Sequence, residues 1–338
     1  MATIYDIAKE AGVSKSTVSR VINNQAGVNK DKKQIVLDAI KKFNYKPNAA
    51  ARSLGLKRNN TIGVLVHDLS DSFFSEYVKQ INNIFANELH YGALYCTTNK
   101  STPNKVNYLE QLNKSVDGYV FLGEDVVSKQ ELKVLMCDNE LFVGIGTNLT
   151  FEEGVMVDIN NYNASYQAVE YLINLGHTKI LYISQKEKRI EFSERYMGYQ
   201  KALMDYKLKC QPYYEIGFKI DEAYEIAKTV KNEIEEKGIT AVMCFNDIAA
   251  SGLVDGLIDL GFKIPGDISI IGFDDSKDLM NTRNQIPLLT TIRQPNKEMA
   301  EYGVNELYKM IIDGKKGESK EFKCELVIRE TTDIPRKK

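Results

Sequence analysis

The sequence lacks the features of membrane-spanning and secreted proteins. Its 338 residues contain no run of eighteen apolar residues, so no segment is expected to cross a bilayer as a helix. The first twelve residues, MATIYDIAKEAG, have no basic region followed by an apolar stretch and a small-residue cleavage site. These absences predict a cytoplasmic protein without a membrane partner.

Cysteine and histidine are scarce and scattered. The five cysteines are odd in number and form no CxxC pair, so they are expected to be small core residues in a reducing compartment. The three histidines lie far apart, and no two have metal-ligand spacing such as HxxxH. The sequence therefore predicts no disulfide framework, no metal site and no cofactor.

Charge is unevenly distributed along the chain. Residues 1–60 contain 12 Lys and Arg against 4 Asp and Glu, a net charge of +8, whereas the other 278 residues carry a net charge of −10. A basic N-terminal segment on an acidic body suggests that this segment alone meets a polyanion. Basic segments are often merely solvated, but this one has the periodicity of a folded domain.

The N-terminal segment has the pattern of three short helices. Apolar residues recur at helical spacing over residues 4–11, and Gly12 then supplies a turn. Ser14 is a good N-cap for a second helix, expected over residues 15–23, and Asn29 is a good N-cap for a third. The expected apolar face of the third helix consists of Ile35, Ala39, Ile40 and Phe43.

The second helix would present small hydroxyls, amides and two cations to the outside. A helix of this kind fits the DNA major groove, where Arg and Lys can pair with guanine O6 and N7. We therefore expect residues 1–46 to form an all-α helix-turn-helix head, with base contacts from Lys15, Ser16 and Arg20. The residues expected to hold phosphates, or simply to cap and pack the helix, are Ser14, Thr17, Ser19 and Asn23.

Residues 47–60 are expected to form a hinge helix and a linker. Pro47 ends the preceding helix, and the short helix that follows, of roughly seven residues, is too short to be stable alone in water. It is expected to order only on DNA, where Leu54 wedges between base steps of the minor groove beside Ala51 and Arg52. The alternative is a flexible interdomain linker, and both can hold in turn.

The remaining residues alternate short apolar runs with amphipathic stretches. This alternation predicts βαβ units and parallel sheets, and the length favours two α/β subdomains over one open sheet. Ligands bind beyond the carboxyl ends of the strands in such sheets. The apolar runs are 61–66, 92–98, 118–123, 141–146, 179–184, 239–245 and 267–273.

Polar and aromatic residues follow several of these runs. Carboxylates, an amide and a guanidinium at strand ends suit a polyhydroxylated ligand, and an aromatic ring can cover the apolar face of a sugar. Asp247 and Asp275 can instead cap helices, Phe74 can belong to the core, and His67 is a further candidate. The cleft candidates are Asp68, Asp71, Phe73, Phe74, Arg195, Asn246, Asp247, Asp274 and Asp275.

Two motifs near the N-terminus resemble a known family. TIYDIAKEAGVSKSTVSRVIN followed by YKPNAAARSL is similar to the DNA-binding head and hinge helix of the lactose-repressor (LacI/GalR) family of bacterial transcription regulators. The resemblance continues through LINLGHTKILYIS, FNDIAASGL and GFKIPGDISIIGFDD. It implies a periplasmic-binding-protein-like effector and dimerisation domain over residues 61–338. Its two lobes would comprise roughly 61–160 plus 292–320, and 161–289 plus 321–338.

The resemblance also implies a site and its partners. The family's motifs place Phe73, Asn161, Arg195, Asn246 and Asp274 at effector-contacting positions. This chain departs from the family at the lid over the ligand, where GFKIDEAY replaces a Gly-Asp pair followed by an aromatic residue. The implied protein is a homodimer that binds a pseudo-palindromic double-stranded operator. A small effector controls its affinity for DNA: a mono- or disaccharide is expected, and a purine or nucleoside is the alternative.

Two other functions compete with a repressor. A sugar-processing enzyme is disfavoured because the chain has no P-loop and no GxSxG elbow, and VGIGTNL lacks the third glycine of GxGxxG. An extracytoplasmic transport receptor is disfavoured by the basic head and the missing signal peptide. We therefore predict a regulator rather than an enzyme, associated with the nucleoid. A tetramer held by a C-terminal coiled coil is not expected, because RETTDIPRKK has no heptads.

Overall fold

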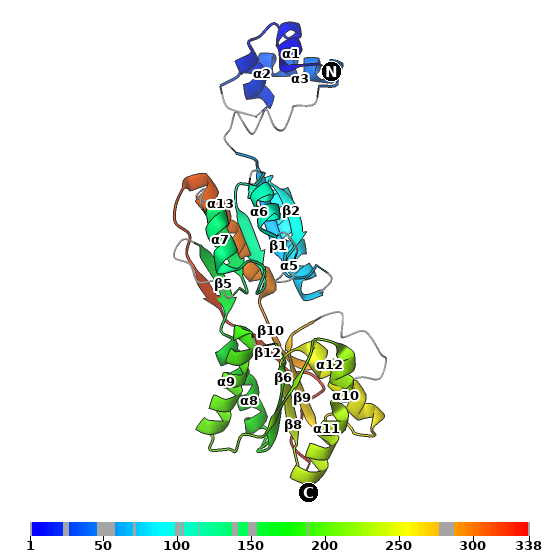
Figure 1. The fold of residues 1–338 in the computed structure, drawn as a ribbon. Coiled ribbons are helices and arrows are strands. Elements are labelled where there is room, and N and C mark those ends of the chain that lie inside the picture. The colour runs from blue at the N-terminus through cyan, green and yellow to red at the C-terminus, as the bar shows by residue number, and fades with distance from the viewer. Residues whose placement is uncertain are drawn as a thin grey trace. The chain divides into compact units, whose positions relative to one another are not determined.

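The structure is a computed structural model that describes residues 2–22, 27–45, 58–69, 72–98, 102, 105–113, 115–136, 141–147, 154–187, 189–276 and 287–336. The chain divides into two units, Met1–Asn60 and Thr61–Lys338 (Figure 1). Within the described residues, no helix is long and apolar enough to cross a membrane.

The first unit contains three short helices, α1 (Ile4–Glu10), α2 (Lys15–Ile22) and α3 (Lys30–Lys42). Thr3 and Asp6 form a capping box at the start of α1, and the side chain of Asn29 accepts a hydrogen bond from the Asp31 amide at the start of α3. The helices pack on a small apolar core. The predicted helix-turn-helix, including the cap at Asn29, is confirmed.

The apolar face of α3 differs from the prediction. Val36 and Ala39 are buried, whereas Ile35 is 49% exposed and Phe43 is 38% exposed. Ile35 precedes Val36 by one residue, which rotates its side chain by about 100° around the helix and away from the core. The buried face of α3 is therefore centred on Val36 and Ala39 rather than on Ile35 and Phe43.

The second unit contains two six-stranded sheets, which define two lobes. The sheet of lobe 1 has the order β11-β5-β4-β3-β1-β2, and all of its pairs are parallel. Its strands β1, β3 and β4 are buried on both faces, which is why they appear in the sequence as continuous apolar runs. The strands are β1 (Thr61–Val66), β2 (Gly92–Thr97), β3 (Tyr119–Leu122), β4 (Phe142–Ile145), β5 (Val155–Ile159) and β11 (Lys320–Phe322).

The sheet of lobe 2 has the order β12-β10-β9-β8-β6-β7. Four of its five strand pairs are parallel, and β10 with β12 is antiparallel. The predicted α/β class with two mostly parallel sheets is confirmed. The strands are β6 (Ile180–Gln185), β7 (Tyr213–Ile216), β8 (Ala241–Cys244), β9 (Ser269–Asp274), β10 (Thr290–Arg293) and β12 (Glu325–Val327).

Helices cover both faces of each sheet (Figure 1). In lobe 1 these are α5 (Ser72–Asn83), η1 (Ile84–Leu89), α6 (Lys105–Asn113), α7 (Lys129–Met136) and α13 (Asn296–Asp313). In lobe 2 they are α8 (Asn161–Asn174), α9 (Ile190–Asp205), α10 (Ile220–Glu225), α11 (Ala227–Asn232), η2 (Glu233–Lys237) and α12 (Asp247–Asp259). These helices lie on the faces of the sheets and do not cover the carboxyl ends of the parallel strands.

The chain passes between the lobes three times. It leaves lobe 1 after β5, returns after β10 and crosses again between β11 and β12. The second and third crossings lie a few residues beyond the predicted positions at 292 and 320. Residues Thr290–Arg293 pair in parallel with β9, which keeps them in lobe 2, and Lys320–Phe322 pair with β5, which keeps them in lobe 1.

Candidate nucleic-acid interface and ligand cleft

Helix α2 has one buried face and one polar outer face. Val18 and Val21 are buried against the other helices of the first unit. Lys15, Ser16 and Arg20, the predicted base-reading residues, are all exposed. Helix α2 is therefore held by its apolar face, while three hydrogen-bonding side chains of different length lie at the surface.

The start of α2 is organised by hydroxyl groups. The Thr17 amide donates to Ser14 Oγ at 3.2 Å, which confirms Ser14 as the N-cap. The hydroxyls of Ser16 and Thr17 lie 2.7 Å and 2.9 Å from the same oxygen. Ser19 is half-buried. The predicted contacts that lie outside the described residues are Asn23, Ala51, Arg52 and Leu54.

Tyr5 is an addition to this surface that sequence reasoning missed. It is 65% exposed on α1, and the ammonium of Lys15 lies 4.9 Å from its ring centroid and 3.4 Å from its hydroxyl. The apolar pattern of α1 gives no sign of this pairing, because Tyr5 lies off the buried face.

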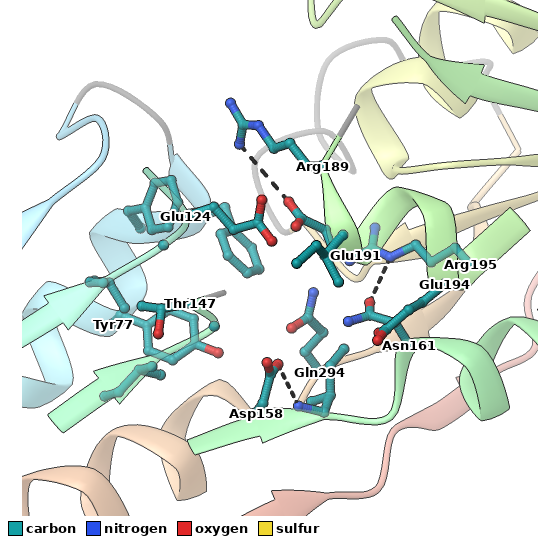
Figure 2. Close-up of a pocket in the computed structure, with 18 residues that line it drawn as sticks. Tyr77, Glu124, Thr147, Asp158, Asn161, Arg189, Glu191, Glu194, Arg195 and Gln294 are labelled. Carbon is teal, nitrogen blue, oxygen red and sulfur yellow. Dashed lines mark hydrogen bonds and ion pairs between the residues drawn. The ribbon is translucent and has the colours of Figure 1, made fainter. Parts of the chain in front are cut away.

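Two adjoining cavities lie between the lobes of the second unit, and the outer one has a volume of about 310 Å³. Their walls come from the carboxyl ends of strands and from the helices that follow (Figure 2). Phe73 and Tyr77 of α5 face the cleft from lobe 1, and the first turns of α9 face it from lobe 2. Both cavities border Phe73, Phe74, Arg189, Glu191, Arg195 and Gln294.

Arg195 is the most constrained cation of the cleft. Its Nε donates to Asn161 Oδ1 at 2.8 Å, and its Nη1 donates to the Phe245 carbonyl at 2.6 Å. The guanidinium carbon lies 3.6 Å from the centroid of the Phe273 ring, and the residue is only 5% exposed. Its Nη2 lies 3.7 Å from Asp274 Oδ1. The predicted residues Asn161, Arg195 and Asp274 are thus neighbours, oriented before any ligand binds.

Asp274 occupies the last position of β9. Its φ of +109° is unusual for a residue with a side chain and marks a tight turn at the cleft edge. Gln294, on the crossover after β10, donates through Nε2 to Asp274 Oδ1 at 2.7 Å. Gln294 borders both cavities and was not predicted, although its position after a strand end follows the same rule.

Two acidic residues that were expected to cap helices have tertiary partners. Asp247 accepts hydrogen bonds from the Thr291 hydroxyl at 2.5 Å and from the Ser276 amide at 2.8 Å. Its burial, with Asp274 nearby, raises its pKa. Asp275 pairs with Arg293 and Arg329. Asp247 is therefore held by tertiary partners, and the segment that Asp275 was expected to cap lies outside the described residues.

Asn246 provides the cap that was expected of Asp247. Its Oδ1 accepts from the Ala249 amide at 2.9 Å at the start of α12, while the residue borders the outer cavity. Phe74 is 8% exposed and packs in the core, as expected, with its ring also bordering the cleft. Asp71 lies outside the described residues.

Aromatic rings line the cleft from both lobes. Phe73 lies 5.3 Å from Phe74 and 5.6 Å from Tyr77, measured between ring centroids. On lobe 2, Phe218 borders the outer cavity, and the Arg189 guanidinium lies 5.0 Å from its ring centroid. Phe218 belongs to the segment in which the sequence departs from the family pattern, and it still supplies an aromatic wall.

Carboxyl groups outnumber cations in the cleft. Glu124 follows β3, Asp158 belongs to β5, and Glu191 and Glu194 are in the first turns of α9. Burial raises the pKa of Asp158 to about 7 and, together with the nearby Glu191, raises the pKa of Glu124 to about 9. These four acids were not predicted. Glu124 directly follows an apolar run, so the strand-end rule could have found it.

No group of three or more metal-ligating side chains occurs in the part of the chain that the structure describes. Aromatic rings, carboxyl acceptors and two guanidinium groups line the cleft, and these are groups that bind organic ligands.

Two family descriptions match the sequence. Residues 3–48 match the bacterial regulatory proteins of the lacI family, and residues 169–332 match a periplasmic binding protein-like domain.

Curated relatives align with nearly the whole chain. The HTH-type transcriptional repressor PurR of Histophilus somni is 34% identical over 337 residues, which cover 98% of this chain and 99% of the relative. PurR of Haemophilus influenzae is 33% identical over 342 residues, covering 98% of each. The HTH-type transcriptional regulator RegA of Clostridium saccharobutylicum is 32% identical over 323 residues, covering 92% of this chain and 93% of the relative.

Solved structures share the fold. The lac repressor dimer bound to operator and an anti-inducer superposes with a TM-score of 0.83 at 24% identity, covering 98% of this chain and 99% of that one. A LacI family regulator from Enterococcus faecium with bound ribose gives a TM-score of 0.71 at 26% identity, covering 82% of this chain and 100% of that one.

A helix-turn-helix head followed by a two-lobed binding domain defines a bacterial transcription regulator. The chain belongs to the lacI family of bacterial regulatory proteins. It is a DNA-binding transcriptional repressor by relationship, and its relatives are regulators rather than enzymes. The predicted family membership, fold class and non-enzymatic function are confirmed.

Proposed function

We propose that this chain represses transcription as a homodimer that binds a pseudo-palindromic operator, with its operator affinity set by a small effector in the cleft. The observation that carries the proposal is the exposed polar face of α2 on a chain that aligns over 98% of its length with repressors. The proposed location is the cytoplasm, where the operator is.

The proposed DNA contacts follow from side-chain chemistry. Lys15, Ser16 and Arg20 contact base edges in the major groove, and each bidentate contact of Arg20 with guanine discriminates by about 1–3 kcal/mol. The hydroxyls of Ser14, Thr17 and Ser19, together with Asn23, hold phosphates and fix the orientation of the helix. Leu54 enters the minor groove between base steps, flanked by Ala51 and Arg52.

The proposed effector is a purine base or nucleoside. Relatives named HTH-type transcriptional repressor PurR align over 98% of this chain, and the purine ligand that this name suggests supports this choice over a sugar. Phe73 and Phe218 supply aromatic side chains from opposite lobes for a flat ring. The proposed contacts are Asp71, Phe73, Asn161, Arg195, Asn246 and Asp274.

A mono- or disaccharide is the second candidate. Asp274 and Gln294 provide paired acceptors and donors that suit adjacent hydroxyl groups, and a family member 26% identical to this chain was solved with bound ribose. In either case, ligand binding between the lobes changes their angle, and through it the pairing of two hinge segments on DNA. Linkage requires that DNA change ligand affinity by the same factor.

A thermal-shift screen of the full chain against purines, nucleosides and sugars tests the effector class. A ligand at one hundred times its Kd should stabilise the folded chain by about 2.7 kcal/mol. Stabilisation by sugars alone would replace the purine proposal with the saccharide. If none of the stabilising ligands changed the affinity of the full chain for operator DNA, the proposed function itself would be contradicted.

A further inference from the structure

Two carboxyl groups from opposite lobes meet inside the cleft. Glu124 comes from the loop after β3 of lobe 1, and Glu191 comes from the first turn of α9 in lobe 2. Figure 2 shows the two carboxyl groups pointing toward each other, and they are close enough to share a hydrogen bond. Ionised carboxylates only accept hydrogen bonds, so this contact requires a proton on one of them.

Glu124 is buried and Glu191 is half-buried, and apart from the proton that they share the pair has no donor from the described residues. Glu124 is 6% exposed, and Glu191 Oε2 is buried without a hydrogen-bond partner. Within the described residues, no protein N–H or O–H donates to the Glu124 side chain. Arg189 Nη1 lies 4.0 Å from Glu191 Oε1, beyond hydrogen-bonding distance. A buried acceptor left without a donor is costly, so these oxygens are open to a donor from a ligand.

The charges around the pair do not neutralise it. From lobe 1 it is faced by Asp125, Asp158 and His67, and from lobe 2 by Arg189, Glu194, Arg195 and Asp274. The two guanidinium groups already have partners, because Arg195 contacts Asn161 and Asp274 while Arg189 contacts Glu187 and His67. The cleft therefore has an excess of acceptors at the point where the lobes meet.

We infer that Glu124 and Glu191 are the specificity-determining residues that receive an amino group of the effector, one N–H donated to each carboxylate, in place of the proton that they share. This inference rests on the proposed function and names the chemistry of its ligand. The shared proton passes to solvent when the ligand binds. The amino group then bridges the two lobes with charge-assisted hydrogen bonds, which are stronger than a bond between neutral groups.

The inference predicts a distinctive dependence on pH. Because both carboxyls must be ionised in the complex and the pKa of Glu124 is raised to about 9, affinity for an amino-bearing ligand should rise with pH up to about pH 9, with release of a proton. A ligand that leaves the shared proton in place would show neither effect.

Calorimetry on the full chain with matched probe pairs tests the inference. The pairs are guanosine with inosine, adenosine with purine riboside, and glucosamine with glucose, and the members of each differ at one amino group. In at least one pair the amino-bearing probe should bind at least about tenfold more tightly, as expected of charge-assisted hydrogen bonds. Its heat of binding should vary with the ionisation enthalpy of the buffer, because a proton is released.

The variants Glu124→Gln and Glu191→Gln should each remove most of this preference and the proton release. Glu225→Gln, an exposed acid of α10 outside the cleft, should leave both unchanged. The thermal midpoint of each variant checks folding, and Glu191→Gln alone suffices if Glu124→Gln unfolds, because the Glu191 side chain is 21% exposed.

Three results would overturn the inference: no amino-bearing probe binds, the amino-free partners bind equally well, or the preference survives in the glutamine variants. Operator binding is measured separately by fluorescence anisotropy. An amino-bearing probe that binds the cleft without altering operator affinity contradicts the proposed function but supports this inference.

Discussion

His67 and Arg189 meet across the two lobes, with 3.3 Å between His67 Nε2 and Arg189 Nη2. His67 Nδ1 lies 3.0 Å from the Glu124 carbonyl, so Nδ1 carries the proton and Nε2 accepts from the guanidinium. This pair joins the end of β1 to the start of α9. It places an imidazole beside the candidate cleft and joins the two lobes through side chains.

Replacing His67 should weaken this link. His67→Asn is too short to reach Arg189 Nη2, so the closed arrangement of the lobes loses one charge-assisted hydrogen bond. The expected cost is roughly 1 kcal/mol, or about fivefold in effector affinity, measured by calorimetry. His90→Asn is the matched control, since His90 is exposed, and Asn tolerates its left-handed φ of 56°. If both variants changed effector affinity equally, His67 would have no specific role in the site.

Asp274→Asn should abolish most of the effector's influence. The substitution keeps the shape of the side chain and an acceptor oxygen for Gln294, but it removes the charge that faces Arg195 and replaces the second acceptor oxygen with an NH2 donor. Ligand affinity is expected to fall by about 1.5–3 kcal/mol, while operator binding without ligand stays within a few-fold of the wild type. Calorimetry that finds unchanged ligand affinity would place the effector elsewhere.

Much of the fold was predictable because its central strands are short and buried on both faces. TIGVLV and GYVFLG are unbroken apolar runs, and both became central strands of lobe 1. Residues 155–159 and 213–216 were not among the predicted runs, since Val155–Ile159 alternates buried with half-buried residues and Tyr213–Ile216 is mostly exposed. Edge and alternating strands carry a weaker signal than central ones.

The contribution of His177 to the free energy of unfolding should fall at acidic pH. Its Nδ1 lies 2.9 Å from the Thr240 hydroxyl and its Nε2 lies 2.9 Å from the Asp333 carbonyl, and burial lowers its pKa. Folding therefore favours the neutral form. The contribution of His177 to the free energy of unfolding is fully present at pH values above its pKa in the unfolded chain. That stabilisation is lost as pH falls through the lower folded pKa.

The variant His177→Gln tests this directly. At pH 7 the wild type should be the more stable by about 1 kcal/mol or more, because the variant loses a buried hydrogen bond. The difference in thermal midpoint between the two should shrink below about pH 6, where only the wild type gains a proton on unfolding. A constant difference across pH would show that His177 does not titrate as described.

The site was harder to predict than the fold. Arg195 and Asp274 could be named because each has a motif position or follows a strand, and they lie together in the structure. Glu191 and Phe218 gave no such signal. Their place in the cleft depends on how α9 and the loop after β7 meet lobe 1, which is a tertiary property that no local spacing encodes.

Two substitutions in the first 60 residues should give separable defects. Arg20→Ala should relax base preference in each half-site by about 1–3 kcal/mol per lost bidentate contact. Leu54→Ala keeps helix propensity but removes the minor-groove wedge, so it should reduce DNA bending and specific affinity with little change in salt-driven binding. A gel-mobility bend assay on one duplex separates them. If Leu54→Ala bends the operator and binds it as the wild type does, residues 48–54 only connect the two units and do not contact the minor groove as proposed.

We propose that residues 1–60 bind operator DNA and that a ligand bound in the cleft changes their affinity for it. The most direct measurement is fluorescence anisotropy on a duplex selected from a random pool by the full chain, with and without the effector found by thermal shift. We predict that the effector changes affinity at least about tenfold, the scale of typical coupling free energies, and that a fragment of residues 61–338 fails to bind the duplex. Unchanged affinity with saturating effector, or equal binding by the fragment, would contradict the account.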